Sequence, residues 1–390
     1  MTTLRNVGRL WSPSEPVRTK VEVVIRRGRI AAIQPSGTAD PEEGDFDCQG
    51  MLLTPGLIDA HTHPLYLSPR LDEVSRRSEG AGYSQIAAAG GGILRTVRET
   101  RGASWAELRS VVSSRLSAWL QAGTTTVEVK TGYHLRVDDE LQAVSLLAGL
   151  GSQPELPALS VTYLAAHELP PEYAGNRARY VEEVADSCGR ARAAGARSCD
   201  VFCDQGAFTV DEARAILAAA ARSGLRLRIH ADELAPTGGS ELAAELQADS
   251  ADHLLRIGER EALLLARAGT VATLCPVTAL AMRMVPPAAD LLRSGVIVAL
   301  GSDHNPGTSG ARAMSLVVYL AVSQLGLSVE QALTAATLGG ARSLRLADRG
   351  AVRKGLRADL ALWEADHEGA VGWDPQLSCR ASWVEGRLSA

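Results

Sequence analysis

Two histidines separated by one residue, His61 and His63, follow an apolar run at residues 52–60. Alternate side chains of a β-strand point to the same side, so the pair could offer two ring nitrogens to one metal ion. Taken alone, such a pair is more often the polar edge of a strand than a metal site. The interpretation therefore depends on further ligands being predicted at the same place.

Two more potential ligands stand at the ends of other strand-like runs. His230 ends the run 226–230, and Asp303 follows the apolar, β-branched run 296–302. Burial of a lone aspartate there would be costly unless it meets a partner or a cation. The predicted ligand set has two histidines from one strand, a third histidine from another and a carboxylate from a further strand. Such a set leaves room for a water molecule on the metal, as hydrolytic metal sites do.

Such distant residues meet only if the fold brings the ends of their strands together. Strand-like runs alternate with Ala-, Leu-, Glu- and Arg-rich helical stretches, a pattern typical of βαβ units. The candidate strands cover residues 57–62, 124–130, 159–167, 199–204, 226–230, 250–253, 270–275 and 296–302. Eight repeats over about 290 residues predict an α/β fold, a (β/α)8 TIM barrel, in which the carboxyl ends of all strands form one rim. Lys130, His167, Asp204 and His253 end four of these runs, so we expect them at the same rim.

Both ends of the chain have a different pattern. Residues 21–33 form two β-rich runs around Arg-Arg-Gly-Arg, which predicts a hairpin. Residues 358–363 and 381–388 are short strand candidates broken by Gly, Pro and Asp. We expect the two ends to pair into one small β domain.

Composition narrows the possible partners. The chain has 390 residues and a net charge of −5, without a cluster of Lys and Arg that could neutralise a phosphate backbone, so we expect no nucleic-acid partner. Eighteen consecutive apolar residues occur nowhere and no export signal is evident, so we expect no membrane partner. Six cysteines are scattered without C-x-x-C pairs, which is typical of reduced thiols and a cytoplasmic location.

Several short motifs together resemble the amidohydrolase superfamily and, within it, the imidazolonepropionase family. They are Pro-Gly-Leu-Ile-Asp-Ala-His-Thr-His at 55–63, Gly-Gly-Gly-Ile at 90–93, Glu-Val-Lys-Thr-Gly-Tyr at 128–133, Ala-His-Glu at 166–168, His-Ala-Asp at 230–232, Asp-His at 252–253 and Ser-Asp-His-Asn-Pro-Gly-Thr at 302–308. The resemblance covers nearly the whole chain. The sequence departs from the family pattern at residues 64–69 and at Asp204, where the family usually has a glutamate.

The resemblance implies a fold, a cofactor and a reaction. The barrel, residues 56–345, would carry a small β-sandwich domain built from residues 1–55 and 346–390. One divalent metal ion, Zn²⁺ or Fe²⁺, would be held by His61, His63, His230 and Asp303. The enzyme would hydrolyse the ring of 4-imidazolone-5-propanoate to N-formimidoyl-L-glutamate, in histidine degradation, and the resemblance also favours a homodimer. Contacts to this small, anionic cyclic amide would come from Arg70, Tyr133, His167, Glu233, Asn305, Gly307 and Thr308.

Catalytic roles follow from that reaction. Glu233 would carry a proton from water to the ring nitrogen, His253 would donate to the developing oxyanion or orient the water, and Asp303 would act as ligand and base. Arg70 would grip the propionate carboxylate. Glu233 could instead be a solvated loop acid, His253 a core histidine and His167 a structural hydrogen-bond donor.

Lys130 could be a rim charge or an ion-pair partner of Glu128 or Asp204, which we prefer to a carbamylated ligand that bridges two metals. Two other functions stay open at this point. A deaminase of a cyclic amidine such as cytosine or guanine would use the same ligand set, and a barrel scaffold without catalysis would keep only the fold.

Overall fold

The computed structural model describes residues 1–38, 40, 42–80, 85–86 and 89–389 of the chain. Its larger part is a parallel sheet whose eight strands follow one another in sequence order. The strands are β6 (Leu57–Asp59), β7 (Thr124–Lys130), β8 (Ala158–Ala166), β9 (Ser198–Cys203), β10 (Arg226–Ala231), β11 (Ser250–His253), β12 (Val271–Leu274) and β13 (Val298–Leu300). All eight strands expected from the sequence are confirmed, and with them the α/β barrel.

The first and last strands of this sheet meet and nearly close the barrel. Ala60 donates its backbone N–H to the carbonyl of Leu300 at 3.2 Å, and Asp303 donates to the carbonyl of His61 at 2.9 Å. Thr62 and His304 form an isolated parallel bridge just beyond. The seam between β6 and β13 therefore carries three of the four predicted metal ligands on its two sides.

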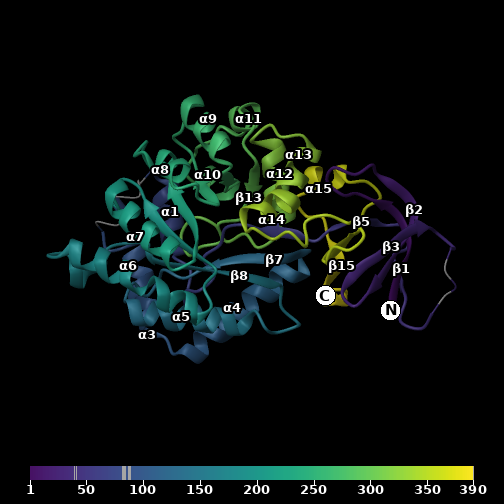
Figure 1. Cartoon of the computed structure of the whole chain (residues 1–390), viewed down its shortest axis with the longest axis horizontal. Coiled ribbons are helices and arrows are strands. Elements are labelled where there is room, and N and C mark those ends of the chain that lie inside the picture. Colours follow the sequence, from purple (N-terminus) through teal and green to yellow (C-terminus); the bar gives the residue numbers. More distant parts are fainter. Residues whose placement is uncertain (39, 41, 81–84, 87–88, 390) are drawn as a thin grey trace.

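Helices surround the barrel (Figure 1). They are α1 (Asp72–Ser78), α3 (Gly92–Gly102), α4 (Trp105–Gln121), α5 (Val137–Leu150), α6 (Arg177–Ala194), α7 (Val210–Arg222), α8 (Gly239–Glu245), α9 (Glu259–Ala268), α10 (Pro276–Ala281), α11 (Ala288–Arg293), α12 (Met314–Ser323), α13 (Val329–Thr334), α14 (Gly340–Ser343) and α15 (Gly369–Trp373). Capping boxes fix the starts of α4, at Ser104 and Glu107, and of α7, at Thr209 and Glu212. Among the described residues, no helix combines the length and apolar character that crossing a bilayer requires.

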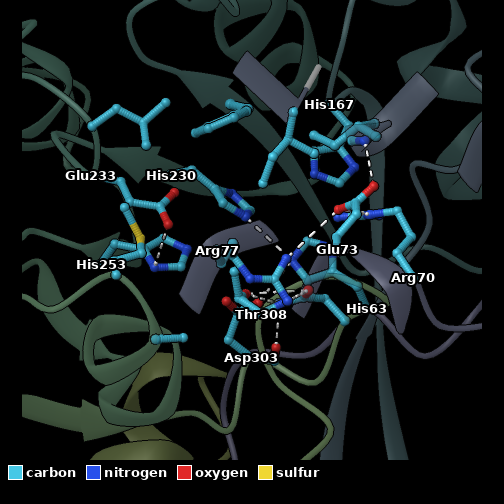
Figure 2. Close-up of a pocket in the computed structure, with 18 of the residues that line it drawn as sticks. His63, Arg70, Glu73, Arg77, His167, His230, Glu233, His253, Asp303 and Thr308 are labelled. Atoms are coloured by element: carbon cyan, nitrogen blue, oxygen red, sulfur yellow. Dashed lines mark hydrogen bonds and ion pairs between the residues drawn. The ribbon is translucent and has the colours of Figure 1, made fainter. Parts of the chain in front are cut away.

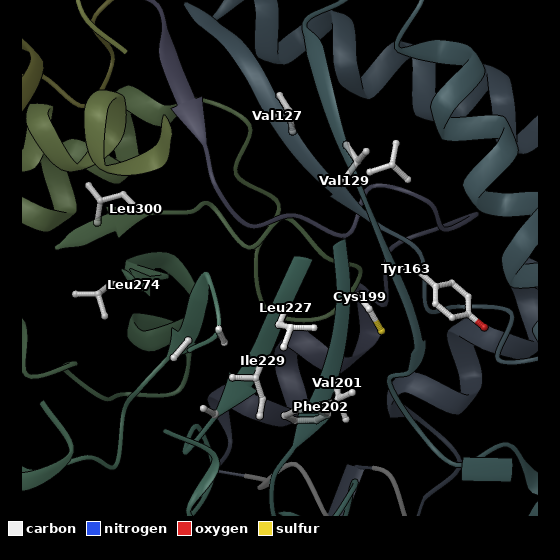
Figure 3. Close-up of a cluster of buried hydrophobic side chains, with 14 of the residues drawn as sticks. Val127, Val129, Tyr163, Cys199, Val201, Phe202, Leu227, Ile229, Leu274 and Leu300 are labelled. Carbon is white, nitrogen blue, oxygen red and sulfur yellow. The ribbon is translucent and has the colours of Figure 1, made fainter. Parts of the chain in front are cut away.

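Side-chain alternation along the barrel strands separates an apolar layer from a polar one. Val127, Val129, Val201, Ile229 and Leu274 belong to the large buried hydrophobic cluster of the barrel (Figure 3). The residues that alternate with them, such as Glu128, Lys130, Asp200 and Arg228, are polar: Lys130 contacts Glu128 and Asp200, and Arg228 contacts Glu128. Since neighbouring residues of a strand point to opposite faces, these polar side chains lie on the other face, toward the barrel axis.

A second sheet is built from both ends of the chain, which lie side by side in Figure 1. Its strands are β1 (Thr2–Leu10), β2 (Arg18–Arg26), β3 (Arg29–Pro35), β4 (Phe46–Asp47), β5 (Leu52–Pro55), β14 (Leu360–Trp363), β15 (Cys379–Val384) and β16 (Arg387–Leu388). They run in the order β16-β15-β14-β5-β1-β2-β3, with β4 beside β1, around a hydrophobic cluster of their own. The predicted hairpin is the antiparallel pair β2–β3, and the small β domain is confirmed.

Candidate metal centre and substrate cavity

The three predicted histidine ligands meet at the carboxyl end of the barrel. The Nε2 atom of His63 lies 3.1 Å from Nε2 of His61 and 3.4 Å from Nε2 of His230. Oδ1 of Asp303 lies 3.5 Å from the same His63 atom and 3.6 Å from Nε2 of His61. Two ligands that each lie about 2.1 Å from a tetrahedral ion are about 3.4 Å apart, so the set has the spacing of atoms that share one cation.

The far sides of two of these rings show which nitrogen faces the centre. His61 Nδ1 lies 2.6 Å from Oδ2 of Asp252, and His230 Nδ1 lies 3.1 Å from Oδ2 of Asp200. A carboxylate is acceptor-only, so Nδ1 of His61 carries the proton and its Nε2 presents a lone pair, and the nearby carboxylate of Asp200 favours the same arrangement in His230. Converging lone pairs repel one another unless a cation lies between them. The residues therefore fit a metal ion, and the chain carries a metal-binding site.

A buried charge network supports these carboxylates from inside the barrel. Lys130 Nζ lies 2.9 Å from Glu128, 2.7 Å from Asp200 and 3.5 Å from Asp252. Arg228 Nη2 adds contacts to Asp252 at 3.2 and 3.4 Å. These cations hold the pKa of Asp252 well below its usual range, although burial alone would raise it. The network keeps both carboxylates ionised behind the histidines.

This network corrects the sequence-based view of Lys130. Glu128 is its partner as predicted, but Asp204 is not, and the lysine is fully buried inside the barrel instead of lying at the rim. Asp204 follows the end of β9, four residues and about 13 Å of extended chain after Asp200, so of the two only Asp200 contacts the lysine. Its ammonium group is committed to three carboxylates, so nothing in this arrangement favours a carbamylated lysine.

A cavity of about 330 Å³ opens beside the candidate metal centre. Most residues predicted from the sequence to bind substrate or to act in catalysis line it. They are Arg70, Tyr133, His167, Glu233, His253, Asp303, Asn305 and Thr308, together with the ligands His63 and His230. His61 lies behind them with no exposed surface, and Gly307 is set back from the lining.

Glu233 and His253 face each other on one side of the cavity (Figure 2). His253 Nδ1 lies 3.7 Å from Oε1 of Glu233. Burial raises the pKa of Glu233 to about 8, with a further contribution from Asp303, and burial lowers the pKa of His253 to about 3. Near neutral pH the carboxyl can therefore take up or release a proton, whereas the imidazole stays neutral.

Backbone geometry aims these side chains at the cavity. His253 and Asp303 have φ angles of 73° and 47°, in the left-handed region that non-glycine residues seldom occupy. Such conformations concentrate at functional sites, where the surrounding structure over-determines them. Asp204 fixes the loop after β10 by accepting backbone N–H groups of Glu233 at 2.6 Å and Leu234 at 2.9 Å.

His167 and Tyr133 form another part of the lining. His167 Nδ1 lies 3.0 Å from the carbonyl of Gly132, so it donates there and turns Nε2 outward as an acceptor. Gly132 has a φ of +115°, and a Cβ added to it would lie 2.9 Å from His167 Nδ1. Only glycine therefore fits this close approach.

The loop after β13 is held together by Asn305. Its amide oxygen accepts the N–H groups of Gly307 and Thr308, both at 2.8 Å, and its amide nitrogen donates to the carbonyl of Asp303 at 2.7 Å. A Cβ on Gly307 would lie 2.1 Å from Nη2 of Arg70, so glycine leaves room for that guanidinium. Asn305 and Gly307 therefore position Thr308 and Arg70, which line the cavity.

Arg70 is buried and makes two side-chain bonds. Its Nε donates to Glu73 at 2.9 Å and its Nη1 donates to Thr96 at 2.6 Å. Two cavity-lining arginines, Arg77 and Arg283, were missed from the sequence. Arg77 follows Glu73 by four residues on α1, the spacing of an ion pair on one helix face, and this signal could have identified it. Arg283 lies in a loop without any periodic signal.

The segment that departs from the family pattern, residues 64–69, is fixed by Arg115. Its Nη1 donates to the carbonyls of Pro64 and Tyr66 at 2.7 and 2.5 Å. The guanidinium also lies 3.5 Å above the ring of Tyr66, a cation–π contact. This segment leads directly to Arg70, whose side chain still reaches the cavity despite the changed sequence.

Solved structures resemble the fold closely. A 5-methylcytosine deaminase from Klebsiella pneumoniae superposes with a TM-score of 0.79 at 19% identity, covering 100% of this chain and 98% of that one. An adenosine deaminase from Xanthomonas campestris, with bound zinc, gives a TM-score of 0.76 at 18% identity over 99% and 92% of the two chains. At such identity these likenesses concern the fold alone.

Sequence relatives are much closer. The chain is 42% identical over 350 residues to an imidazolonepropionase from Pyrobaculum arsenaticum, covering 88% of this chain and 85% of the relative. It is also 42% identical over 357 residues to an imidazolonepropionase from Rubrobacter xylanophilus, covering 90% and 86%. The sequence model of the amidohydrolase family matches residues 52–387. The chain therefore belongs to the amidohydrolase family, among the relatives that carry the name imidazolonepropionase.

Proposed function

We propose that this protein is an imidazolonepropionase, which hydrolyses 4-imidazolone-5-propanoate to N-formimidoyl-L-glutamate. The observation that carries the proposal is that three histidine Nε2 atoms and Asp303 converge at the edge of a cavity that the buried guanidinium of Arg70 also lines. A cyclic amide with an anionic side chain matches both halves of that cavity. Imidazolonepropionase is also the name of relatives that are about 40% identical over most of the chain.

We propose a single divalent ion, Zn²⁺ or Fe²⁺, held by His61, His63, His230 and Asp303. When bound, such an ion supplies Lewis-acid chemistry and lowers the pKa of a coordinated water to about 7. Asp200 and Asp252 would keep the Nε2 atoms of two ligands directed at it.

The chain's own side chains account for the proton movements. Glu233 accepts a proton from the water that adds to the ring carbonyl carbon, and then gives it to the ring nitrogen as the C–N bond breaks. A carboxyl whose pKa burial raises to about 8 suits both steps near neutral pH. His253, kept neutral by burial, donates to the oxygen on which negative charge develops.

The other lining residues would place the ring. His167 presents Nε2 as an acceptor for a ring N–H, while Tyr133 and Thr308 lie along the same cavity. Arg70 would contribute its remaining guanidinium N–H groups to the propionate, beside Asn305 and Gly307.

The proposal is tested by offering the purified, metal-loaded protein 4-imidazolone-5-propanoate and, separately, cytosine. We expect ring opening of the first and no deamination of the second. Turnover of cytosine alone would make the protein a deaminase, and a protein that binds no metal and turns over neither compound would be the scaffold. The solved deaminases share only the fold, so they do not favour the deaminase.

Glu233→Gln tests the mechanism within the same assay. We expect kcat to fall about 10²- to 10⁴-fold while bound metal stays near the wild-type amount, because the amide cannot carry the proton. Glu245→Gln, on the exposed surface of α8, is the matched control and should keep full activity. An unchanged kcat in Glu233→Gln would remove this residue from the mechanism.

We further propose that residues 1–55 and 346–390 form one domain and residues 56–345 the other, since β5 ends at Pro55 in the terminal sheet and β6 begins the barrel at Leu57. A cytoplasmic location and a homodimer are part of the same proposal. Fractionation and light scattering of the purified protein test them.

A further inference from the structure

One side of the cavity is lined by arginines that the proposed mechanism does not use. Arg77 on α1 and Arg283 in the loop after α10 both line it, next to Arg70 and Glu73. Figure 2 shows Arg70, Glu73 and Arg77 grouped together, with Glu233 and His253 on the other side of the cavity. The two sides of the cavity therefore differ in charge.

Glu73 holds this cationic group in place. Its Oε2 accepts from Arg70 Nε at 2.9 Å and lies 3.6 Å from Arg77 Nη1, while its Oε1 accepts the backbone N–H of Gly92 at 2.8 Å. One carboxylate thus faces two guanidinium groups. Arg77 Nη2 donates to the carbonyl of Gly307, whereas 3.6 Å is too long for a hydrogen bond, so Arg77 Nη1 still has its N–H groups to offer.

The third guanidinium reaches the same region from across the cavity mouth. Arg283 Nη2 lies 3.4 Å from the carbonyl of Ser78, the residue after Arg77. The backbone of Arg283 has a φ of 57°, a left-handed conformation that is unfavourable for arginine. Among the described residues that line this side, the three guanidinium groups of Arg70, Arg77 and Arg283 outnumber the single carboxylate of Glu73, which leaves two positive charges.

Partial burial strengthens the interaction that Arg77 can make with a ligand, whereas Arg283 is exposed. The side chain of Arg77 is 22% exposed, and burial together with Arg70 lowers its pKa. A guanidinium so placed gains most from a ligand carboxylate, with which it can form two parallel hydrogen bonds.

We propose that Arg77 and Arg283 together bind the carboxylate of the substrate side chain, and that Glu73 is the positioning residue that orients Arg70 and Arg77 around it. The carboxylate specificity of the enzyme then depends on Arg77 and Arg283 in addition to Arg70. This inference rests on the proposed function for the identity of the substrate. It concerns a carboxylate subsite, which can be measured without turnover.

The experiment compares Arg77→Met, Arg283→Met and the double variant in two assays. The first measures kcat and KM for 4-imidazolone-5-propanoate, and the second measures binding of N-formyl-L-glutamate to the metal-loaded protein by calorimetry. Arg76→Met is the matched control, because Arg76 is the neighbouring arginine of α1 and does not belong to this cavity's lining. Melting curves verify that the variants fold.

We expect each single variant to raise KM and to weaken N-formyl-L-glutamate binding about tenfold, since a charge-assisted hydrogen bond is lost. The double variant should lose about a hundredfold, and kcat should change much less than KM. Arg77→Lys and Arg283→Lys keep the charge without the planar fork, so they should lie between the Met variants and wild type. They also serve as the test if a Met variant does not fold.

The outcomes separate this inference from the proposed function. Unchanged KM and unchanged N-formyl-L-glutamate binding in both single variants would overturn the inference, even in an active imidazolonepropionase. If wild type fails to open the ring but binds N-formyl-L-glutamate through Arg77 and Arg283, the proposed function is wrong and the carboxylate subsite stands.

Discussion

Asp252 offers a direct test of how the buried network controls metal binding. Its Oδ2 accepts from His61 Nδ1 at 2.6 Å and from Arg228 Nη2 at 3.2 Å, and lies 3.5 Å from Lys130 Nζ. In Asp252→Asn the side-chain shape stays nearly the same, but the negative charge that fixes the proton on Nδ1 is gone. The amide can also donate to Nδ1, which would place the His61 proton on Nε2, where the metal should bind.

The size of the effect follows from these contacts. A hydrogen bond to a charged group is worth roughly 1.5–3 kcal/mol, and outer-shell partners of metal ligands typically affect metal affinity 10–100-fold. We take about 2 kcal/mol, which corresponds to a roughly thirtyfold weaker metal site. Stability should fall as well, because the two buried cations lose one of three carboxylates.

The assay is competition with a zinc chelator of known affinity, followed by activity at increasing free zinc. We expect weaker binding in Asp252→Asn and partial recovery of activity at high zinc. Asp249→Asn is the control, since Asp249 lies just before the same strand but pairs with Arg345 and Arg226, away from the ligands. Metal affinity within twofold of wild type in Asp252→Asn would refute the role of the network.

Three further predictions concern stability and the shape of the cavity. Lys130→Met should lower the free energy of unfolding by about 3–5 kcal/mol in urea titrations, because it leaves buried carboxylates without their ammonium partner; a loss below about 1 kcal/mol would contradict this. Gly132→Ala should displace His167 and reduce kcat/KM, whereas Gly206→Ala, also at positive φ (88°) but with nothing within 4 Å, should affect stability alone; equal activity losses in both would contradict this. Burial lowers the pKa of His304 to about 3. As the pH falls below about 6.5, this histidine is therefore protonated in the unfolded chain before it is protonated in the folded one. The free energy of unfolding then drops by up to about 1.4 kcal/mol per pH unit. His304→Gln should flatten that slope in unfolding experiments between pH 6.5 and 4.5, the exposed His367→Gln should not, and identical slopes would argue against the buried histidine.

The sequence predicted the fold, and it predicted as metal ligands four residues that the structure brings together, because both depend on local signals. Each barrel strand is a short apolar run between helical stretches, and a parallel barrel then brings the strand ends together whatever their separation along the chain. His61, His63, His230 and Asp303 were predicted on this basis, and the structure places their ligand atoms together.

The supporting residues were harder to predict because their partners lie on other strands. Asp200 and Arg228 are charged residues inside apolar runs, a signal that could have marked them as members of a buried network. Lys130 was expected at the rim because it ends its strand, but a long side chain can turn inward and reach a carboxylate one layer below. The position of Arg283 at the cavity depends on a loop conformation with positive φ, which cannot be predicted from the periodicity of the sequence.

The position of the metal site at the seam between β6 and β13 also matters for the stability of the barrel. His61 and His63 stand on one side of it and Asp303 on the other, about 240 residues later in the chain. A cation shared by these side chains would act as a reversible cross-link that staples the first and last strands, much as a disulfide closes a long loop. Loss of the ion should then loosen the barrel at this seam first, which would appear as faster amide hydrogen exchange at Ala60 and Asp303 than at the strands opposite.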